Sequence, residues 1–519
     1  MRSARTVDSP RILATAAAAL ALCAAGCGRP APPPQAAATV PAELRRGLGA
    51  EPETLDPRLA SDNASLTVAG DLYEGLTTED ATGRIVPGAA ASWQVSTDGR
   101  AWTFVLRPGL QWSNGDALTA HHFAAGLAAV IAPGSVSPNA GLLDGVESVT
   151  AADDRTLSVR LRRPVPYLPA LLALPVAAPL HPRVAAISNG TYRLVEWRRG
   201  QDLLLERNDR YNGAARVAID RVRHVVVAEL GTELNLFRTG ELHVTSEVPN
   251  ESLPRIRTTL PDSLRISPYL NTYAYAVNLR RVGDRDARRA LAMAIDRERI
   301  TSQVTGAGER PAYEWVAPGL PGYDGPHYTW RELPAAERIE AARAAWRTAA
   351  ARGAAPERIV LCTDASANHR RTAVALADQW RTALGVETEI VELEWSVYLD
   401  TLDEPGQCDL VRFGWSADFA DPEAFAAVFA GSHPQNRLGY ASDRYDSLLA
   451  ESRLASEPAH RLALLAAAEA QLLDDVPVIP LFHRVAKRLV SPEVGGHFAN
   501  PLGHLPSRDL TWSHGADRN

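Results

Sequence analysis

Lysine is almost absent from this chain, and acidic residues outnumber basic ones. Lys487 is the only lysine, so nearly all cationic side chains are arginines. Because alanine is also very frequent, we attribute this bias to a GC-rich genome rather than to function. The formal net charge of −7 argues against nucleic acid or an anionic lipid surface as the main partner.

Cysteine is scarce as well, with four residues in 519. Cys23 and Cys27 lie near the N-terminus, which leaves Cys362 and Cys408 in the body of the chain. Two cysteines do not make the disulfide framework of a small secreted scaffold. Both fall in expected strands of one domain, and a disulfide is permitted in an exported protein. The sequence leaves open whether they pair.

Long hydrophobic runs are missing too, apart from one stretch near the N-terminus. Ile12–Cys23 follows a basic opening and is too short for a transmembrane helix, which is typical of a signal peptide. Small residues at 24–26 then lead into Cys27, a pattern that predicts a lipobox. We interpret residues 1–27 as a lipoprotein signal peptide with lipidation at Cys27, and an ordinary secretory cleavage is the alternative. Both predict export, to the periplasm or the outer face of a bacterial membrane.

Residues 28–43 are rich in proline and alanine and show no apolar period. Such a composition cannot bury a core and stays extended, so this segment is expected to be a tether. The folded body should therefore begin near Leu44. A lipid anchor would be its only contact with the membrane.

Motifs that usually mark catalysis or a bound cofactor are also missing. The sequence contains no Gly-x-Ser-x-Gly elbow, no phosphate-binding loop and no His-Glu-x-x-His helix. His121 and His122 are adjacent on an expected helix, where neighbouring positions point apart and make poor joint metal ligands. We expect no enzyme activity, no cofactor and no metal site.

The pattern of apolar residues predicts strands and helices mixed along the whole body. Thr119 is a good N-cap for a helix over Ala120–Ile131. Apolar residues at helical spacing predict a second helix over Asp286–Ile300. Strands are expected at Trp102–Leu106, Thr156–Leu161, Leu203–Glu206 and Arg223–Ala228.

From Ile359 onward, strands and helices alternate regularly. Strands are expected at Ile359–Thr363, Val386–Leu393 and Asp409–Trp415, with helices at His369–Leu384 and Ser396–Leu402 between them. This βαβαβ run predicts a parallel sheet with helices on its faces. A helix over Arg461–Leu473 and a strand over Val476–Phe482 follow.

A series of short segments carries the strongest functional signal. They occur at 49–57, 71–76, 85–93, 98–104, 106–109, 112–115, 119–123, 189–192, 205–208, 294–297 and 414–418, the last reading Gly-Trp-Ser-Ala-Asp. In this order they closely resemble the family 5 extracellular solute-binding proteins of ABC importers, and the oligopeptide-binding proteins among them most of all. The resemblance covers essentially all the chain from about Leu44.

This resemblance implies an α/β, periplasmic-binding-protein-like fold of type II, cluster C, with two lobes, a hinge and an inserted extra domain. Domain I would comprise 44–63, 190–270 and 483–519, domain II 64–189 and domain III 271–482. The resemblance also implies a monomeric receptor that captures short peptides in a closing cleft and delivers them to ABC permease and ATPase subunits.

Several ligand contacts carry over from the family. Asp418 matches the aspartate that pairs with the peptide ammonium, and Arg412 matches an arginine that meets the peptide carboxylate. His369 matches a histidine that serves the carboxylate of longer peptides. Glu51 adjoins a segment that pairs with the peptide backbone, and Trp415 lies in the same motif as Asp418.

The chain also departs from the family pattern. Thr305 stands in place of a lysine that reaches some peptide carboxylates, and Ala274 and Ala125 stand in place of tyrosines. Asn271 and Ser416 replace a cysteine pair of the close relatives. These changes leave the preferred peptide open, and a receptor for another small ligand, such as a metal chelate, haem or an opine, is the alternative.

Overall fold

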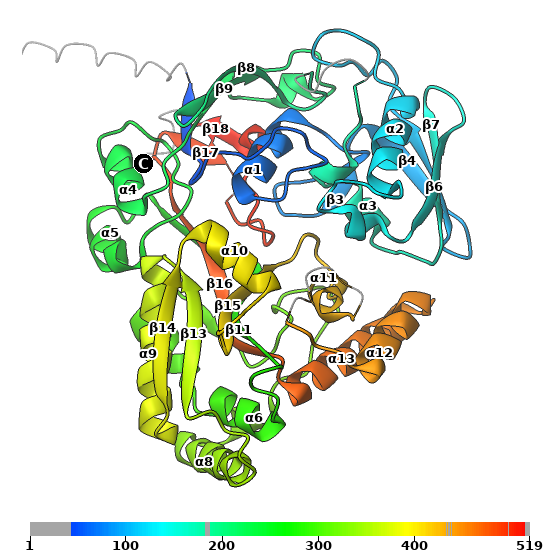
Figure 1. Cartoon of the computed structure of the whole chain (residues 1–519). Helices are drawn as coiled ribbons and strands as arrows, with labels where there is room; N and C mark the ends of the chain where they lie inside the picture. Colours follow the sequence, from blue (N-terminus) through cyan, green and yellow to red (C-terminus); the bar gives the residue numbers. More distant parts are fainter. Residues whose placement is uncertain are drawn as a thin grey trace, which may run out of the picture. The chain divides into compact units, whose positions relative to one another are not determined.

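The computed structural model describes residues 43–181, 187–431, 433, 436, 438–496 and 498–513 (Figure 1). The unit Ala42–Asn519 is compact, and its first strand begins at Leu44, as the sequence predicted. The predicted signal peptide, Cys27 and nearly all of the tether lie outside the described residues. Every helix of the described part is too short or too polar to cross a bilayer.

A four-stranded sheet gathers strands from the start of the chain and from its middle. Its order is β1 (Leu44–Gly47), β10 (Arg221–Val225), β9 (Asp202–Arg207) and β8 (Tyr192–Arg198). β1 pairs parallel with β10, and the other neighbours are antiparallel. The predicted strands over Leu203–Glu206 and Arg223–Ala228 are therefore confirmed, the second with shifted bounds. All four strands fall within predicted domain I.

A second four-stranded sheet is antiparallel throughout. Its order is β4 (Ala90–Val95), β5 (Ala101–Leu106), β7 (Thr156–Leu161) and β6 (Val146–Ala151). Every second residue of β5 and β7 is buried, which is the alternation expected of a half-buried strand. Helix α2 (Ala120–Ile131) has the predicted bounds. It begins with the backbone N–H of Thr119 donating to Nδ1 of His122 at 3.1 Å, so His122 acts as a helix cap.

The third sheet has six strands and is mixed rather than parallel. Its order is β12 (Arg310–Pro311), β16 (Val478–Leu489), β11 (Leu264–Val277), β15 (Leu410–Ser416), β13 (Arg358–Asp364) and β14 (Glu387–Leu393). β13 pairs parallel with β14 and β15, as the βαβαβ run predicted. The prediction of a parallel sheet is wrong for the rest, because β11 and β16 enter from outside that run and pair antiparallel.

Helices pack against this sheet and share a core with it. Figure 1 shows α9 (Ala367–Leu384) running alongside β13 and β14, with α8 (Ala335–Ala351) and α6 (Arg285–Met293) near its lower end. Trp380 of α9 is fully buried in their shared core. The chain leaves α9 through Gly385, whose φ of 74° is the left-handed conformation that glycine tolerates best.

The predicted helix over Asp286–Ile300 is wrong as a single element. The chain forms α6, then the short α7 (Arg297–Arg299), then a π-helical turn over Ile300–Thr305. Asp296 interrupts the first helix because its side chain caps the second, accepting from the N–H of Arg299. Arg297 is fully buried and donates to the carbonyls of Ala292 and Pro480 at 3.0 and 2.9 Å. These bonds hold the break in place.

Outside the three sheets, the described chain forms further helices and two small ribbons. Further helices are α1 (Asn63–Leu72), α3 (Leu168–Leu171), α4 (Leu230–Arg238), α5 (Leu253–Thr259), α10 (Trp395–Asp403), α11 (Glu423–Ala426), α12 (Asp443–Leu454) and α13 (Pro458–Asp475). Two small antiparallel ribbons pair β2 (Thr77–Glu79) with β3 (Ile85–Pro87) and β17 (Val494–Gly496) with β18 (Leu510–Trp512).

Candidate functional site

The candidate site lies at one edge of the six-stranded sheet. β13 ends at Asp364 and β15 ends at Ser416, and the two strands are parallel neighbours. Their C-terminal ends therefore meet at the same edge, where open α/β sheets place their ligands. Asp418 follows β15 directly, and His369 lies in the first turn of α9, which follows β13.

Asp364 joins two of the predicted ligand contacts. Its Oδ1 accepts from Nε of Arg412 at 3.0 Å and lies 2.7 Å from Nδ1 of His369. We call Asp364, His369 and Arg412 the Asp364 cluster. The guanidinium of Arg412 also lies 4.6 Å from the ring centre of Tyr398, whose hydroxyl donates to the Arg412 carbonyl at 2.8 Å. The side chains of Arg412 and Asp364 are only 14% and 11% exposed, so these two residues form a largely buried ion pair.

The protonation states of the cluster follow from these contacts. Burial by itself would raise the pKa of Asp364, but the hydrogen bond from His369 and the charge of Arg412 lower it to about 2. Burial lowers the pKa of His369, and the Arg412 charge adds to this against the attraction of Asp364. At neutral pH, Asp364 is therefore charged and His369 is neutral.

Asp418 has a different environment, because its carboxylate has no hydrogen bond or ion pair among the described residues. Burial raises its pKa to about 6, opposed by the charge of His504. His504 in turn has Nδ1 2.9 Å from Oε2 of Glu79. Burial by itself would lower the pKa of His504, but the charge and hydrogen bond of Glu79, together with Asp418, raise it. A half-buried carboxylate without a partner is suited to receive a cation from a ligand.

Glu51 and Trp415 make internal contacts instead. Glu51 accepts from the indole N–H of Trp197 at 3.0 Å and from the N–H of Gly200 at 2.9 Å, which holds the turn between β8 and β9. The indole of Trp415 donates to the carbonyl of Ala424 at 2.6 Å. Within the described part of the chain, the structure brings Arg412 and His369 together and gives Glu51 no contact with them.

Sequence reasoning missed Asp364 and His504. Asp364 comes directly after the predicted strand Ile359–Thr363, so the rule that ligands meet strand ends could have nominated it. His504 had no such signal, because it contacts Glu79 from a position 425 residues away in the chain.

The departures from the family pattern have local replacements. The side chain of Asn271 donates to Oγ of Ser416 at 2.6 Å, so a hydrogen bond links the two positions that lost their cysteines. Thr305 donates to Glu309 at 2.8 Å, and the buried Lys487 lies 3.7 Å from the same carboxylate group. The single lysine thus lies close to the position that lost one.

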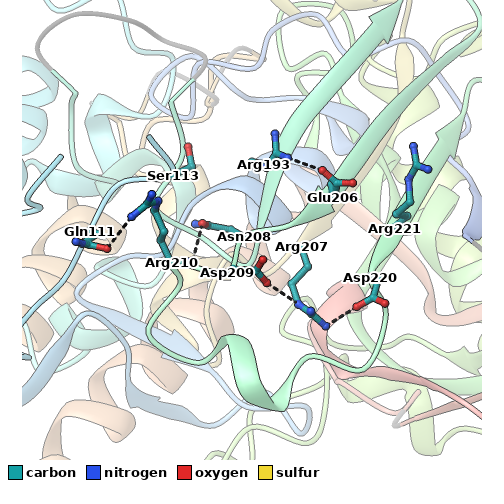
Figure 2. A pocket seen from close by; sticks show the side chains of 10 residues that line it. All are labelled: Gln111, Ser113, Arg193, Glu206, Arg207, Asn208, Asp209, Arg210, Asp220 and Arg221. Atoms are coloured by element: carbon teal, nitrogen blue, oxygen red, sulfur yellow. Dashed lines mark hydrogen bonds and ion pairs between the residues drawn. The ribbon is translucent and has the colours of Figure 1, made fainter. Parts of the chain in front are cut away.

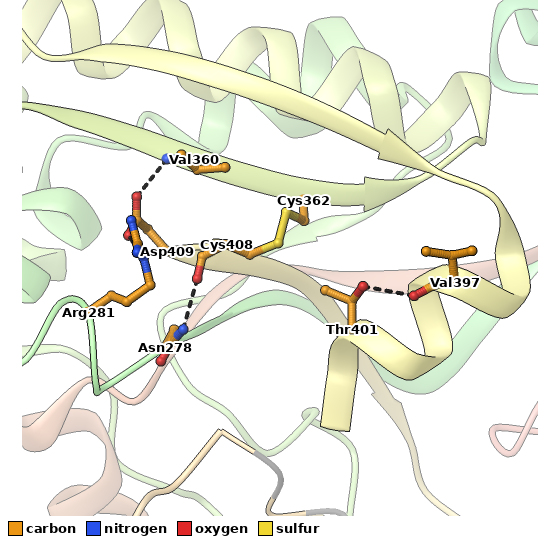
Figure 3. Close-up of a disulfide and its surroundings, with 8 residues drawn as sticks. All are labelled: Asn278, Arg281, Val360, Cys362, Val397, Thr401, Cys408 and Asp409. Atoms are coloured by element: carbon orange, nitrogen blue, oxygen red, sulfur yellow. Dashed lines mark hydrogen bonds and ion pairs between the residues drawn. A yellow bond between two sulfur atoms is a disulfide. The ribbon is translucent and has the colours of Figure 1, made fainter. Parts of the chain in front are cut away.

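Cys362 and Cys408 form a disulfide, which the sequence left open (Figure 3). Their Cα atoms are 5.8 Å apart, and the bond ties β13 to the residues that precede β15. Beside it, Asp409 accepts from the N–H of Val360 at 2.7 Å. The disulfide therefore braces the two strands that carry Asp364 and Arg412.

Removing this disulfide should destabilise the lobe that contains it. The bond closes a loop with a sequence separation of 46, and such a cross-link typically stabilises by about 2–4 kcal/mol. We expect the double variant Cys362→Ala and Cys408→Ala to unfold at a lower guanidinium concentration than the wild type. Wild-type protein treated with a reductant should shift by a similar amount. Equal midpoints for all three would contradict a stabilising disulfide.

A large surface cavity lies elsewhere in the molecule. It measures about 650 Å³ and is lined mainly by charged side chains of β8, β9 and their neighbours (Figure 2). Most of these are already paired, for example Arg193 with Glu206 and Arg207 with Asp209. None of the candidate residues lines it, so this cavity is separate from the candidate site at the sheet edge.

Comparisons with known proteins agree with the fold. The family model described as bacterial extracellular solute-binding proteins, family 5 middle, matches residues 84–437. The periplasmic oligopeptide-binding protein OppA of Escherichia coli (strain K12) is 31% identical over 501 residues, covering 90% of this chain and 92% of that protein. The probable deoxycholate-binding periplasmic protein YgiS of the same strain is also 31% identical, over 492 residues, covering 89% of this chain and 91% of that protein.

Solved structures give the same result. The murein tripeptide-binding protein MppA of Escherichia coli superposes with a TM-score of 0.83 at 28% identity, covering 91% of this chain and 98% of that one. OppA of Haemophilus influenzae in complex with the peptide RPPGFSPFR superposes with a TM-score of 0.82 at 29% identity, covering 91% of this chain and 99% of that one. This chain therefore belongs to the bacterial extracellular solute-binding proteins of family 5.

Proposed function

We propose that this protein captures short peptides and delivers them to an ABC permease. The observation that carries the proposal is the half-buried carboxylate of Asp418, which has no hydrogen bond or ion pair among the described residues and follows the strand that carries Arg412. A peptide ammonium bound there would gain a charge-assisted hydrogen bond that the described residues do not supply. The relatives named above for oligopeptides and murein peptides support the same ligand class.

The bound peptide would run from Asp418 toward Arg412 and His369. Backbone pairing of an extended peptide with the protein is indifferent to side-chain identity. Each added residue moves the far end by about 3.4 Å, so peptides of different length would reach the Asp364 cluster in different registers. Trp415 would contribute by fixing the backbone near Asp418, since its indole N–H is held by the carbonyl of Ala424. Glu51 would act from the turn between β8 and β9 that it holds.

Peptide affinity should depend on pH through Asp418. Its pKa of about 6 means that the carboxylate becomes neutral as the pH falls below that value and can no longer pair with an ammonium. The peptide amino group loses its charge above a pKa of about 7.7–8.0. We expect the affinity to be highest between these values and about tenfold weaker at pH 5 than at pH 7. Calorimetric titrations between pH 5 and pH 9 would measure this profile, and an affinity that rises on acidification would contradict it.

Ligand binding should close domain III onto domain I. β11 and β16 run across the predicted boundaries at 270/271 and 482/483, so these two strands connect the proposed domains. A hinge-type closure would lower the radius of gyration on binding. Small-angle scattering with and without a peptide measures it, and an unchanged profile at saturating ligand would count against closure.

A second candidate is a receptor for a non-peptide ligand on the same scaffold. The observation in its favour is that a relative named for deoxycholate is as similar as one named for oligopeptides. Native mass spectrometry of the protein as purified separates the two, because a closed cleft retains its ligand. A released mass that fragments into amino acids supports the peptide receptor, whereas a steroid, chelate, haem or opine mass supports the alternative.

The leader and the oligomeric state belong to the same proposal. We infer that the chain is exported, that Cys27 is lipidated and that the receptor works as a monomer. Mass spectrometry of the N-terminal fragment from membranes would detect the acyl chains. Finding the mature protein cleaved at another residue without acyl chains would favour ordinary secretion.

A further inference from the structure

We propose that Asp364 makes the Arg412–His369 end of the peptide site select a neutral peptide or carboxamide group over a free carboxylate. This inference rests on the proposed function, since it concerns the end group of a peptide bound there. It would make Asp364 a specificity-determining residue and would change the role expected of Arg412 and His369.

The first reason is the hydrogen bond between Asp364 and His369. A charged carboxylate can only accept, so Nδ1 of His369, 2.7 Å away, must carry the proton. In a neutral imidazole the other nitrogen, Nε2, is then an acceptor. About a fifth of the His369 side chain is exposed, so a ligand can reach it. Nε2 can accept a ligand N–H, but it has no proton to give to a carboxylate.

The second reason is the ion pair between Asp364 and Arg412. Oδ1 of Asp364 accepts from Nε of the Arg412 guanidinium at 3.0 Å. The terminal nitrogens of Arg412 make no hydrogen bond among the described residues. These nitrogens can donate to a ligand oxygen. A ligand carboxylate placed there would lie next to the Asp364 carboxylate, whose pKa of about 2 keeps it charged. Two like charges on one largely buried arginine repel each other, which penalises the acid form.

The third reason is that the surrounding charges are already balanced. Arg484 lies 3.1 Å from Glu247, and Lys487 lies 3.7 Å from both Glu247 and Glu309. Arg484 lowers the pKa of His369, and His369 lowers the pKa of Glu247, so these charges act on the Asp364 cluster. Among these described residues the three cations are therefore matched by three anions, which leaves none of the three free for a ligand carboxylate: Arg412, Arg484 and Lys487 against Asp364, Glu247 and Glu309.

A peptide or carboxamide group fits what remains. It carries a carbonyl oxygen that can accept from the terminal nitrogens of Arg412 and an N–H that can donate to Nε2 of His369. A carboxylate carries two acceptors and no donor. The end of the site is thus complementary to an amidated terminus, an Asn or Gln side chain, or a chain that continues past the cluster.

The test compares matched peptides with a free amino terminus, two to six residues long, as C-terminal acids and as C-terminal amides. Isothermal titration of the full chain measures both series. We expect the amide to bind about tenfold more tightly than the acid at the length whose end reaches the Asp364 cluster.

Asp364→Asn removes the competing charge and should shift the ratio of amide affinity to acid affinity toward the acid by about tenfold. Glu392→Gln is the matched control, because it removes one carboxylate from the exposed pair with Arg370 near the same strand ends. It should leave the ratio unchanged.

The inference is overturned if the acid binds at least as tightly as the amide at every length. It is also overturned if Asp364→Asn leaves the ratio as it is in the wild type. Should Asp364→Asn fail to fold, the wild-type comparison decides alone. Failure of every peptide to bind, in either form, would overturn the proposed function and this inference with it. Binding of peptides with a preference for the acid would overturn the inference and leave the proposed function standing.

Discussion

Asp418→Asn should abolish most of the affinity for peptides that carry a free amino terminus. The substitution keeps the shape of the side chain and removes the charge that would pair with the ligand ammonium. Loss of one partner of a desolvated charge pair typically costs about 2–5 kcal/mol. At the lower end this is about a 30-fold loss of affinity, which titration calorimetry detects easily.

The fold should tolerate this change well. Asp418 has no hydrogen bond or ion pair among the described residues, and burial holds its charged form at a disadvantage, as its raised pKa shows. We therefore expect the thermal midpoint of the unliganded variant to equal that of the wild type or exceed it. Asp443→Asn, which removes an exposed carboxylate from α12, is the control for the change in net charge. A variant at Asp418 that binds free peptides as tightly as the Asp443 control would remove this residue from the ligand site.

Arg412→Ala should destabilise the lobe built on the six-stranded sheet, beyond any effect on ligand binding. The variant leaves the Asp364 carboxylate largely buried without its cation, and breaking a buried pair from one side typically costs about 3–5 kcal/mol. It also removes the contact of the guanidinium with the ring of Tyr398. Calorimetric unfolding of the unliganded protein should show a midpoint lowered by roughly 6 °C or more for that lobe.

A double variant separates charge from packing at this position. Replacing both Arg412 and Asp364 by apolar residues removes the uncompensated charge, and such exchanges are often close to neutral. We expect Arg412→Leu with Asp364→Leu to be more stable than Arg412→Ala. Equal destabilisation of the two would mean that packing, rather than the unpaired carboxylate, accounts for the loss.

The sequence predicted those parts of the fold that depend on local patterns. Helix α2 and strand β7 have the predicted bounds because a good cap and strict alternation define them within a few residues. The antiparallel strands of the six-stranded sheet were not predicted as part of it, because their partners lie far away in the chain. The break at Asp296 was missed for a similar reason, since a buried arginine and a distant carbonyl stabilise it.

The candidate site shows the same division. Asp418, Arg412 and His369 could be nominated because each lies in a recognisable segment. What surrounds them could not, since the bond between Asp364 and Arg412 depends on how two strands are aligned in the sheet. The charge of a site depends on all the groups near it. Four of these groups come from remote segments of the chain: Glu79, His504, Arg484 and Lys487. For this reason the resemblance implied that Arg412 meets a peptide carboxylate, and it did not show that Arg412 already pairs with Asp364.

One titration decides whether a ligand ammonium pairs with Asp418. The wild-type protein, freed of retained ligand by denaturation and refolding, is titrated with one peptide and with its N-acetylated twin at pH 7. Acetylation removes the ammonium and leaves the rest of the peptide unchanged. We expect the free peptide to bind at least about 30-fold more tightly than the acetylated one. Equal affinity for the two forms would contradict it.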